Sequence, residues 1–185
     1  MSCQHGIDDL REATTQDIDA IEKVYKSAFP EEESESVTKL AVQLLKDNET
    51  SPKIYSFVAL LKNTVVGHVS FSPVVDANDV GFRGYILAPL AVQSDYHKHG
   101  IGSKLVKHGL EQLTNVGVHA VFVYGDPGYY GRFGFRADIA ENTKVDYEVK
   151  YPSGWQGLIL NDCHHTETGT RNISVHAALC DEELW

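Results

Sequence analysis

The stretch from Leu87 to Leu113 constrains the fold more than any other part of the chain. It begins as an apolar strand, turns at a polar segment, and then passes through Gly100 and Gly102. The apolar residues that follow recur at helical spacing: Ile101, Leu105, Val106, Leu110 and Leu113. The pattern predicts a strand, a glycine turn and a helix in direct succession.

A helix that begins among glycines is a candidate anion-binding site. The first N–H groups of a helix have no acceptor within the helix, and the helix dipole adds partial positive charge there. Gly100 and Gly102 lack a Cβ, so the backbone can approach a phosphate closely. Ser103 adds a hydroxyl donor. We therefore expect the turn from His99 to Ser103 to hold a phosphate.

A dinucleotide-binding fold is one alternative for this stretch. Its motif requires a third glycine three residues after Gly102, and that position holds Leu105. Asp126 follows at a distance that would suit a ribose-binding acid. A nucleotide-binding oxidoreductase is therefore a weaker hypothesis, and absence of NAD(P) binding would exclude it.

Pro89 lies in a strand whose other residues have a buried character. Proline has no N–H for the hydrogen-bond ladder and is normally absent from the middle of a paired strand. The strand is therefore predicted either to bulge or to part from its neighbour. Either arrangement leaves the main-chain groups of Leu90 and Val92 available to a ligand, in a slot that leads to the glycine turn.

Three segments, in the expected order, resemble the GNAT N-acetyltransferases and, within them, the YhbS-like branch. The strand end Leu90-Ala91-Val92 followed by His97–Gly102 resembles the acetyl-CoA motif, (Gln/Arg)-x-x-Gly-x-(Gly/Ala). The segment Gly125–Phe135 is similar to the signature Gly-Asp-Pro-x-x-Tyr-x-Arg-Phe-Gly-Phe, and Val66–Val74 also resembles that branch. His97 stands where Gln or Arg is usual, but the glycines that bind phosphate through the main chain are present.

The resemblance implies an α/β protein with the GNAT acyl-CoA N-acyltransferase fold, a mixed central sheet with a splayed strand pair flanked by helices. It implies transfer of an acetyl group from acetyl-CoA, the cosubstrate, to a primary amine of a small molecule or a protein. The N–H of Val92 is then the expected donor to the thioester carbonyl. Contacts with acetyl-CoA are expected from Leu90, Ala91, Val92, His97, Lys98, His99, Gly100, Ile101, Gly102, Ser103 and Tyr130.

Tyr130 is the candidate general acid. It matches the tyrosine of the family at the start of the last short helix, and a phenol with an ordinary pKa of about 10 is protonated at neutral pH. It could therefore donate a proton to the departing thiolate. In the alternative interpretation, Tyr130 is a packing residue beside Tyr129 and Phe133.

The general base stays open at the level of sequence. The strand that ends at Val92 carries no acidic residue, although many GNAT enzymes place a glutamate there. The candidates are His68, Asp126, the acidic stretch Glu31–Glu33, and water that leads to bulk solvent. A histidine within a strand is more often structural, and Asp126 can instead fix its Asp-Pro turn. An acyl-CoA-binding regulatory module with weak or no catalysis is therefore the alternative function.

Composition limits the class of protein further. The 185 residues, 42% of them hydrophobic, suit a single domain over 1–185, with 1–8 flexible and strands in 140–185 completing the sheet.

A net charge of −10 disfavours nucleic acid and mildly favours a cationic acceptor. The three cysteines lack CxxC spacing and the histidines lack a zinc-site spacing, so we expect no metal. With no apolar signal or membrane-spanning segment, we expect a cytoplasmic protein. We expect a monomer or a homodimer.

The remaining pattern predicts the other elements. Residues 31–35 are expected to form an acidic loop between two helices. One predicted helix has Thr15 as its N-cap residue and ends before Pro30, and a second covers 36–46. Predicted strands cover 10–13, 54–61, 64–75, 118–124, 145–149 and 155–160, with weak alternation over 172–178. The apolar strand 118–124 is expected to pair in parallel with the strand that ends at Val92.

Overall fold

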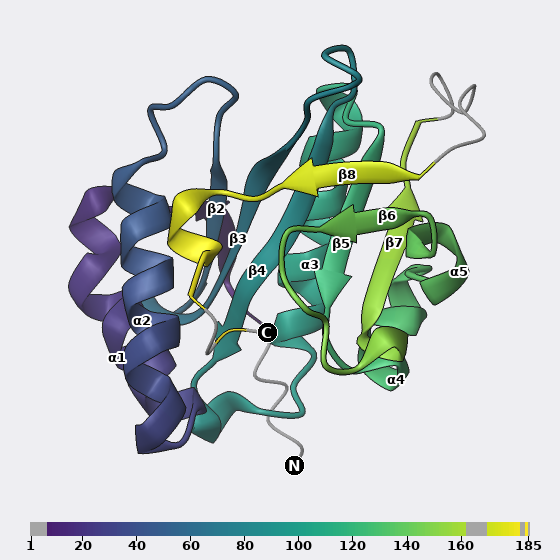
Figure 1. Ribbon diagram of the computed structural model, residues 1–185. Coiled ribbons are helices and arrows are strands. Elements are labelled where there is room, and N and C mark those ends of the chain that lie inside the picture. Colours follow the sequence, from purple (N-terminus) through teal and green to yellow (C-terminus); the bar gives the residue numbers. More distant parts are fainter. Residues whose placement is uncertain (1–6, 162–169, 182–183, 185) are drawn as a thin grey trace. The chain divides into compact units, whose positions relative to one another are not determined.

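Two long strands, β3 (Thr64–Asp76) and β4 (Gly84–Val92), run through both halves of the protein in the computed structural model (Figure 1). The structure describes residues 7–161, 170–181 and 184. The chain divides into two compact units, the first made of Met1–Phe71 with Ala88–Gly109 and the second of Ser72–Leu87 with Leu110–Trp185. Each unit therefore contains its own part of the β3–β4 pair.

The strands of the first unit follow the order β1-β2-β3-β4. Both β1 (Asp9–Glu12) and β3 pair antiparallel with β2 (Tyr55–Leu61). The β2–β3 turn is made by Lys62 and Asn63, whose φ angles of 50° and 60° suit a tight hairpin. The predicted hairpin is thereby confirmed.

Two helices cover one face of the strands in the first unit. Helices α1 (Ile18–Ala28) and α2 (Glu31–Lys46) lie side by side in Figure 1, drawn in purple and blue. Their buried apolar residues pack in one core with Val58, Val65 and Ala91 of the strands. Burial of this apolar face against the sheet fixes both helices.

The predicted acidic loop over residues 31–35 was wrong. Helix α2 begins at Glu31 rather than at Ser36, with Pro30 as its N-cap residue. Three glutamates, Glu31–Glu33, lie in its first turn. Carboxylates are stabilised there by the positive end of the helix dipole, so the acidic run favours the start of the helix.

The first part of α3 (Ile101–Asn115) packs on the opposite face of these strands. The side chains of Ile101 and Leu105 lie over Gly67 of β3. The ring of His108 meets Phe57 edge-on with centroids 4.8 Å apart. Since Phe57 and Val58 are neighbours on β2, their side chains point to opposite faces, and α3 lies across the sheet from α1 and α2.

The second unit shows the strand separation that Pro89 predicts. Strand β5 (Ala120–Tyr124) pairs in parallel with β4, but only from Gly84↔Ala120 to Ile86↔Phe122. Strand β4 continues to Val92 without a further partner on β5, while β5 pairs antiparallel with β7 (Trp155–Ile159) along its whole length. The parallel pairing and the splayed strand pair are both confirmed.

A smaller set of elements completes the second unit. Helices α4 (Pro127–Tyr130) and α5 (Ala137–Ala140) precede β6 (Thr143–Val145), which pairs in parallel with β8 (Arg171–Ser174). The predicted strand over 145–149 was wrong, because β8 offers partners only to residues 143–145. Strand β8 also pairs antiparallel with the end of β3. The guanidinium of Arg171 holds this pairing, since it lies 2.6 Å from Asp76 Oδ2 and 3.8 Å from the centroid of the Phe82 ring.

Several sequence predictions concern residues outside the described ranges. Of the stretch 1–8 predicted to be flexible, residues 1–6 lie outside them, whereas the Asp8 N–H donates to Leu60 O at 2.9 Å. Cys3 and Cys163 also lie outside, and Cys180 carries an exposed free thiol. In the part of the chain that is described, no group of His, Cys, Asp and Glu side chains could hold a metal ion, and no helix is long and apolar enough to cross a membrane.

Candidate active site

The main-chain N–H and C=O groups of Leu90 and Val92 point to the edge of β4 that does not pair with β3. The short connection 77–83 joins β3 and β4, and the N–H of Gln93, just beyond β4, donates to Val66 O near the start of β3 at 2.9 Å. The two strands are therefore antiparallel. Because main-chain groups alternate between the two edges of a strand, the N–H groups of Leu90 and Val92 point to the edge where pairing with β5 has ended.

The side chains of this segment follow the same separation. Ala91 is buried in the core of the first unit, whereas Leu90 and Val92 are only half-buried. The carbonyl of Val92 accepts a hydrogen bond from Nε2 of His97 at 2.7 Å. The imidazole thus satisfies the outward-facing carbonyl of Val92, while the N–H groups of Leu90 and Val92 point to the same edge.

The turn after β4 is fastened to its surroundings on both sides. The Gln93 amide Nε2 donates to Val65 O at 3.3 Å. The N–H of Ser94 donates to Ser27 Oγ on α1 at 3.0 Å, and the two hydroxyl groups also lie 3.0 Å apart. The segment Ser94–Tyr96 is a single 3₁₀ turn. The role of Ser27 could not be predicted from the sequence, because 67 residues separate it from Ser94.

Two left-handed residues bend the chain into the start of α3. Lys98 has φ of 64° and Gly100 has φ of 74°, and between them Nδ1 of His99 lies 2.8 Å from His97 O. Residues of alternating handedness turn successive N–H groups toward one point, which is an anion-binding arrangement. The helix then begins, with its first bond from Lys104 N to Gly100 O at 3.0 Å. The N–H groups that open α3 therefore lie next to this bend.

Tyr130 lies in the second unit, at the end of α4. Asp126 is the N-cap residue of that helix, and its Oδ1 accepts from the Gly128 N–H at 2.8 Å. Gly125 lies directly against the Tyr130 ring, since a Cβ at this glycine would be 2.5 Å from Tyr130 Cε2. The rings of Tyr129 and Phe135 hold Tyr130 from two other sides, at centroid distances of 5.0 Å and 5.9 Å.

The phenol of Tyr130 is strongly held in its protonated form. Desolvation by the surrounding rings raises its pKa well above the ordinary value of about 10, and Tyr129 adds to the shift. The group therefore keeps its proton throughout the physiological range and can act as a donor. Part of the side chain nevertheless stays accessible.

His68 occupies the centre of a buried polar network in the first unit. Its Nδ1 lies 2.9 Å from the Tyr25 hydroxyl of α1, and its Nε2 lies 3.4 Å from Ser70 Oγ, which in turn lies 2.7 Å from Ser56 Oγ. The His68 side chain is completely buried, and desolvation lowers its pKa to about 3. The imidazole is therefore neutral at pH 7, and these contacts favour a role in fastening α1 to the sheet.

The other candidates for the general base belong to different units of the chain. The glutamates Glu31–Glu33 are exposed in the first turn of α2. Asp126 is also exposed, but one of its carboxylate oxygens is used as the helix cap. In the first unit, the structure brings together Leu90–Val92 and His97–Ser103, the residues predicted to contact the cofactor.

Sequence reasoning missed the partners of His68 and a pocket beside Trp155. Three polar residues, Tyr25, Ser56 and Ser70, form the network with His68. A run of polar side chains in a strand of buried character was the signal that could have indicated this network. For Trp155 there was no such signal, because the residues that surround it come from α5, β6 and the loop that follows.

Strand β4 parts from its parallel neighbour and is followed by a left-handed turn and the N-terminus of a helix. This arrangement is typical of a class of α/β proteins that hold a phosphate-bearing ligand at a strand end. The model of the acetyltransferase (GNAT) family matches residues 18–135, and the chain belongs to this family. The family predicted from the three motifs is thus confirmed.

Individual relatives agree with this assignment. YjhQ of Escherichia coli, an uncharacterized N-acetyltransferase, is 33% identical over 120 residues, which are 61% of each chain. YhbS of Escherichia coli is 46% identical over 72 residues, 38% of this chain and 42% of YhbS. These sequence matches therefore span less than two thirds of either relative.

Solved structures extend the similarity over most of the chain. The crystal structure of YhbS from Escherichia coli in complex with CoA has a TM-score of 0.78 at 29% identity, covering 92% of this chain and 91% of that one. A GNAT family acetyltransferase from Brucella melitensis in complex with acetyl-CoA has a TM-score of 0.68 at 28% identity, covering 95% and 99%. The expected GNAT fold is confirmed by these two structures.

Proposed function

We propose that the protein transfers the acetyl group of acetyl-CoA to a primary amine. The observation that carries this proposal is the end of β4, where the Val92 N–H faces the open edge of the strand and the carbonyl is occupied by His97. The left-handed turn and the start of α3 follow directly. The CoA and acetyl-CoA complexes of the two relatives support the choice of ligand.

The first unit supplies the groups that would bind acetyl-CoA. The N–H groups at Gly100–Ser103 would hold the pyrophosphate at the positive end of α3. Leu90 and Val92 would receive the pantetheine arm through their outward-facing main chain. Lys98 is exposed beside the turn and would add a donor to the phosphates, and His99, whose Nδ1–H donates to His97 O, would lie beside them.

The reaction is a direct acyl transfer. The lone pair of the neutral amine attacks the thioester carbonyl carbon, a C–N bond forms, and the carbonyl oxygen takes up negative charge. The Val92 N–H would stabilise that oxygen, as preorganised donors do in acyl transfer. The C–S bond then breaks, the amide nitrogen loses its extra proton, and the thiolate of CoA takes up one proton.

Tyr130 is proposed as the donor of the proton that the thiolate receives. The phenol is protonated at neutral pH because its pKa is raised, so the proton is present when it is needed. The rings of Tyr129 and Phe135 restrict its orientation. The phenolate left behind takes up a proton from water, which regenerates the phenol.

The proton of the amine is proposed to leave through water rather than through a side chain. Both ring nitrogens of His68 have partners inside the core, and one oxygen of Asp126 caps α4. Glu31–Glu33 lie exposed on α2, where they could attract a cationic amine over a distance. The cytoplasmic location, the monomeric or homodimeric state, and independence from nucleic acid and membranes stay predictions.

The proposal is tested by release of the CoA thiol when acetyl-CoA is mixed with a primary amine. The wild-type protein is expected to release CoA faster with the amine than without it. Tyr130→Phe is expected to lower kcat by roughly a hundredfold while the Kd for CoA stays unchanged, because only the proton donor is lost. Tyr129→Phe is the matched control, and an equal loss in both variants would remove Tyr130 from the mechanism.

One observation favours a second function, an acyl-CoA-binding regulatory module. Two residues that the sequence suggested as the general base have structural contacts instead: His68 is buried in the core, and Asp126 caps helix α4. A module of this kind would bind acetyl-CoA with the same turn and transfer nothing. Binding of acetyl-CoA without amine-dependent CoA release would identify it.

A further inference from the structure

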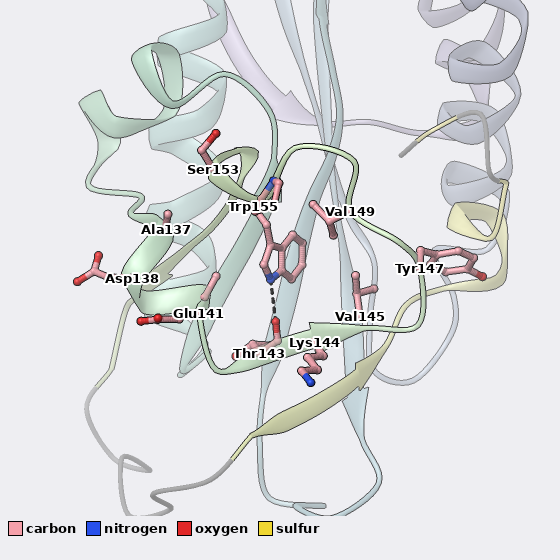
Figure 2. A pocket seen from close by; sticks show the side chains of 12 residues that line it. Ala137, Asp138, Glu141, Thr143, Lys144, Val145, Tyr147, Val149, Ser153 and Trp155 are labelled. Atoms are coloured by element: carbon pink, nitrogen blue, oxygen red, sulfur yellow. Dashed lines mark hydrogen bonds between the residues drawn. The ribbon is translucent and has the colours of Figure 1, made fainter.

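The second unit contains a cavity of about 560 Å³ that the proposed chemistry does not use. We call it the Trp155 pocket, and its apolar lining includes Ala137, Ala140, Val145, Val149, Pro152 and Trp155 (Figure 2). Small-molecule sites in proteins typically have volumes of about 300 to 1,000 Å³ and mainly apolar walls. The pocket has the size and the lining of such a site.

The inner wall of the pocket is apolar because its polar groups are either satisfied or turned outward. The indole N–H of Trp155 donates to Thr143 O at 2.8 Å, and one face of the indole stacks on Phe122 with centroids 5.5 Å apart. In Figure 2 the side chains of Val145 and Val149 lie beside the indole. The charged ends of Asp138, Glu141 and Lys144 point away from the indole in the same view.

The loop that follows β6 turns two valine side chains, Val145 and Val149, toward the indole, whereas the Tyr147 ring points away from it in Figure 2. Val145, Tyr147 and Val149 are half-buried and line the pocket, whereas Asp146 and Glu148 between them are exposed. This alternation is the pattern of a strand with one covered face, yet the strand pairing ends at Val145. The loop therefore holds Val145 and Val149 toward a space that the protein itself leaves unfilled.

Hydrogen bonds tie the pocket wall to the segment that carries Tyr130. The Tyr151 N–H donates to the Tyr124 hydroxyl at 3.0 Å, and the Gly125 N–H donates to Gly154 O at 3.0 Å. Gly125 is also the residue that lies against the Tyr130 ring. The far end of β5 thus positions both the proposed acid and one wall of the pocket.

We propose that the Trp155 pocket binds the apolar body of the acceptor amine, and that the preferred acceptors are primary amines with an aromatic or branched apolar group. This inference rests on the proposed acetyltransferase function. Trp155 is only 7% exposed, so a flat apolar group would lie mainly against Val145 and Val149 beside the indole, where it gains the free energy of apolar burial. The charged side chains among the labelled lining residues point away from the indole in Figure 2, so the amino group of the acceptor stays outside the pocket.

Two amines that differ by a phenyl ring test the inference without acetyl-CoA. The probes are 2-phenylethylamine and ethylamine, titrated into the wild-type protein and followed by the NMR signal of the Trp155 indole N–H, which Trp155→Phe assigns. The phenyl-bearing amine is expected to shift this signal and to bind at least about tenfold more tightly than ethylamine. Equal Kd values for the two amines would overturn the inference.

Substitutions at residues 149 and 150 test whether the preference for 2-phenylethylamine arises in the Trp155 pocket. Val149→Asp introduces a charge into the pocket and is expected to abolish the preference for 2-phenylethylamine. Val149→Thr keeps the shape of valine and is expected to weaken the preference, which provides a test even if the aspartate variant does not fold. Lys150→Gln is the control, because it changes the net charge by the same amount as Val149→Asp but at an exposed position of the loop. This variant is expected to keep the preference for 2-phenylethylamine.

Acetyl transfer separates this inference from the proposed function. Transfer to both amines, with a kcat/KM about tenfold higher for 2-phenylethylamine and lost in the Val149 variants, supports the inference. Transfer to both amines at equal kcat/KM leaves the function intact and overturns the acceptor pocket. Binding of 2-phenylethylamine without transfer to any amine overturns the acceptor role and the proposed function together.

Discussion

The buried imidazole of His68 should make the protein sensitive to mild acid. In the folded state the pKa of His68 is about 3, because burial disfavours the charged form, whereas the ordinary value is 6.5. Between these two values the unfolded chain binds a proton that the folded chain does not bind. The free energy of unfolding therefore falls as the pH drops below about 6.5, and the decrease continues toward about pH 3.

The size of the effect follows from the two pKa values. Each pH unit within this window corresponds to about 1.4 kcal/mol for one group. From about pH 7.5 to about pH 5, the His68 contribution amounts to a loss of about 2 kcal/mol. Asp17, whose pKa the Arg11 guanidinium lowers to about 2, loses its stabilising effect only at more acidic pH, below its ordinary value of 3.8.

Urea unfolding at the two pH values measures this loss. His68→Gln removes the ionisable ring, so the variant should lose about 2 kcal/mol less than wild type over the same pH interval, whatever its stability at about pH 7.5. His99→Gln is the control, because it makes the same change at an exposed position. Equal acid losses in wild type and His68→Gln would refute the assignment of a buried neutral imidazole.

Three further predictions concern the segment around Tyr130 and the route of the proton. Asp126→Ala should lower the unfolding free energy in urea by about 1 kcal/mol, because the cap of α4 is lost, whereas Asp126→Asn retains a cap. A steep drop in kcat for Asp126→Asn at unchanged stability would instead assign Asp126 as the base. Gly125→Ala should displace the Tyr130 ring, since the new Cβ would lie 2.5 Å from Cε2, and should lower kcat by about tenfold or more with the calorimetric Kd for CoA unchanged. If the amine loses its proton to water, the pH profile of kcat/KM should rise about tenfold per pH unit up to the pKa of the amine itself, and a break that stays fixed when the amine is changed would indicate a side-chain base.

The elements that depend on nearby residues could be predicted from the sequence. The strand, the glycine turn and the helix over 87–113 carry their own signals, and so does the β2–β3 hairpin. Pro89 correctly indicated that β4 parts from its neighbour, because a residue without an N–H reveals a gap in the hydrogen-bond ladder. The stretch 87–113 also contains Leu90–Val92 and His97–Ser103, the residues that lie together at the end of β4.

Elements that depend on distant partners could not be predicted in this way. The start of α2 was misplaced because the acidic run from Glu31 was assigned to a loop, whereas carboxylates are stabilised in the first turn of a helix. The alternation over 145–149 is that of a strand, but the partner that decides its length, β8, lies more than twenty residues further along the chain. The environment of His68 depends on Tyr25, which is 43 residues away.

Calorimetric titration of acetyl-CoA tests the central claim most directly. The wild-type protein should bind acetyl-CoA and CoA, and should not bind NAD(P). Gly102→Val should abolish the binding of both CoA species, because its side chain would stand among the N–H groups at the start of α3 where the pyrophosphate is proposed to lie. Absence of CoA binding by the wild type, or equal binding by Gly102→Val, would contradict the assignment of this turn as the acetyl-CoA site.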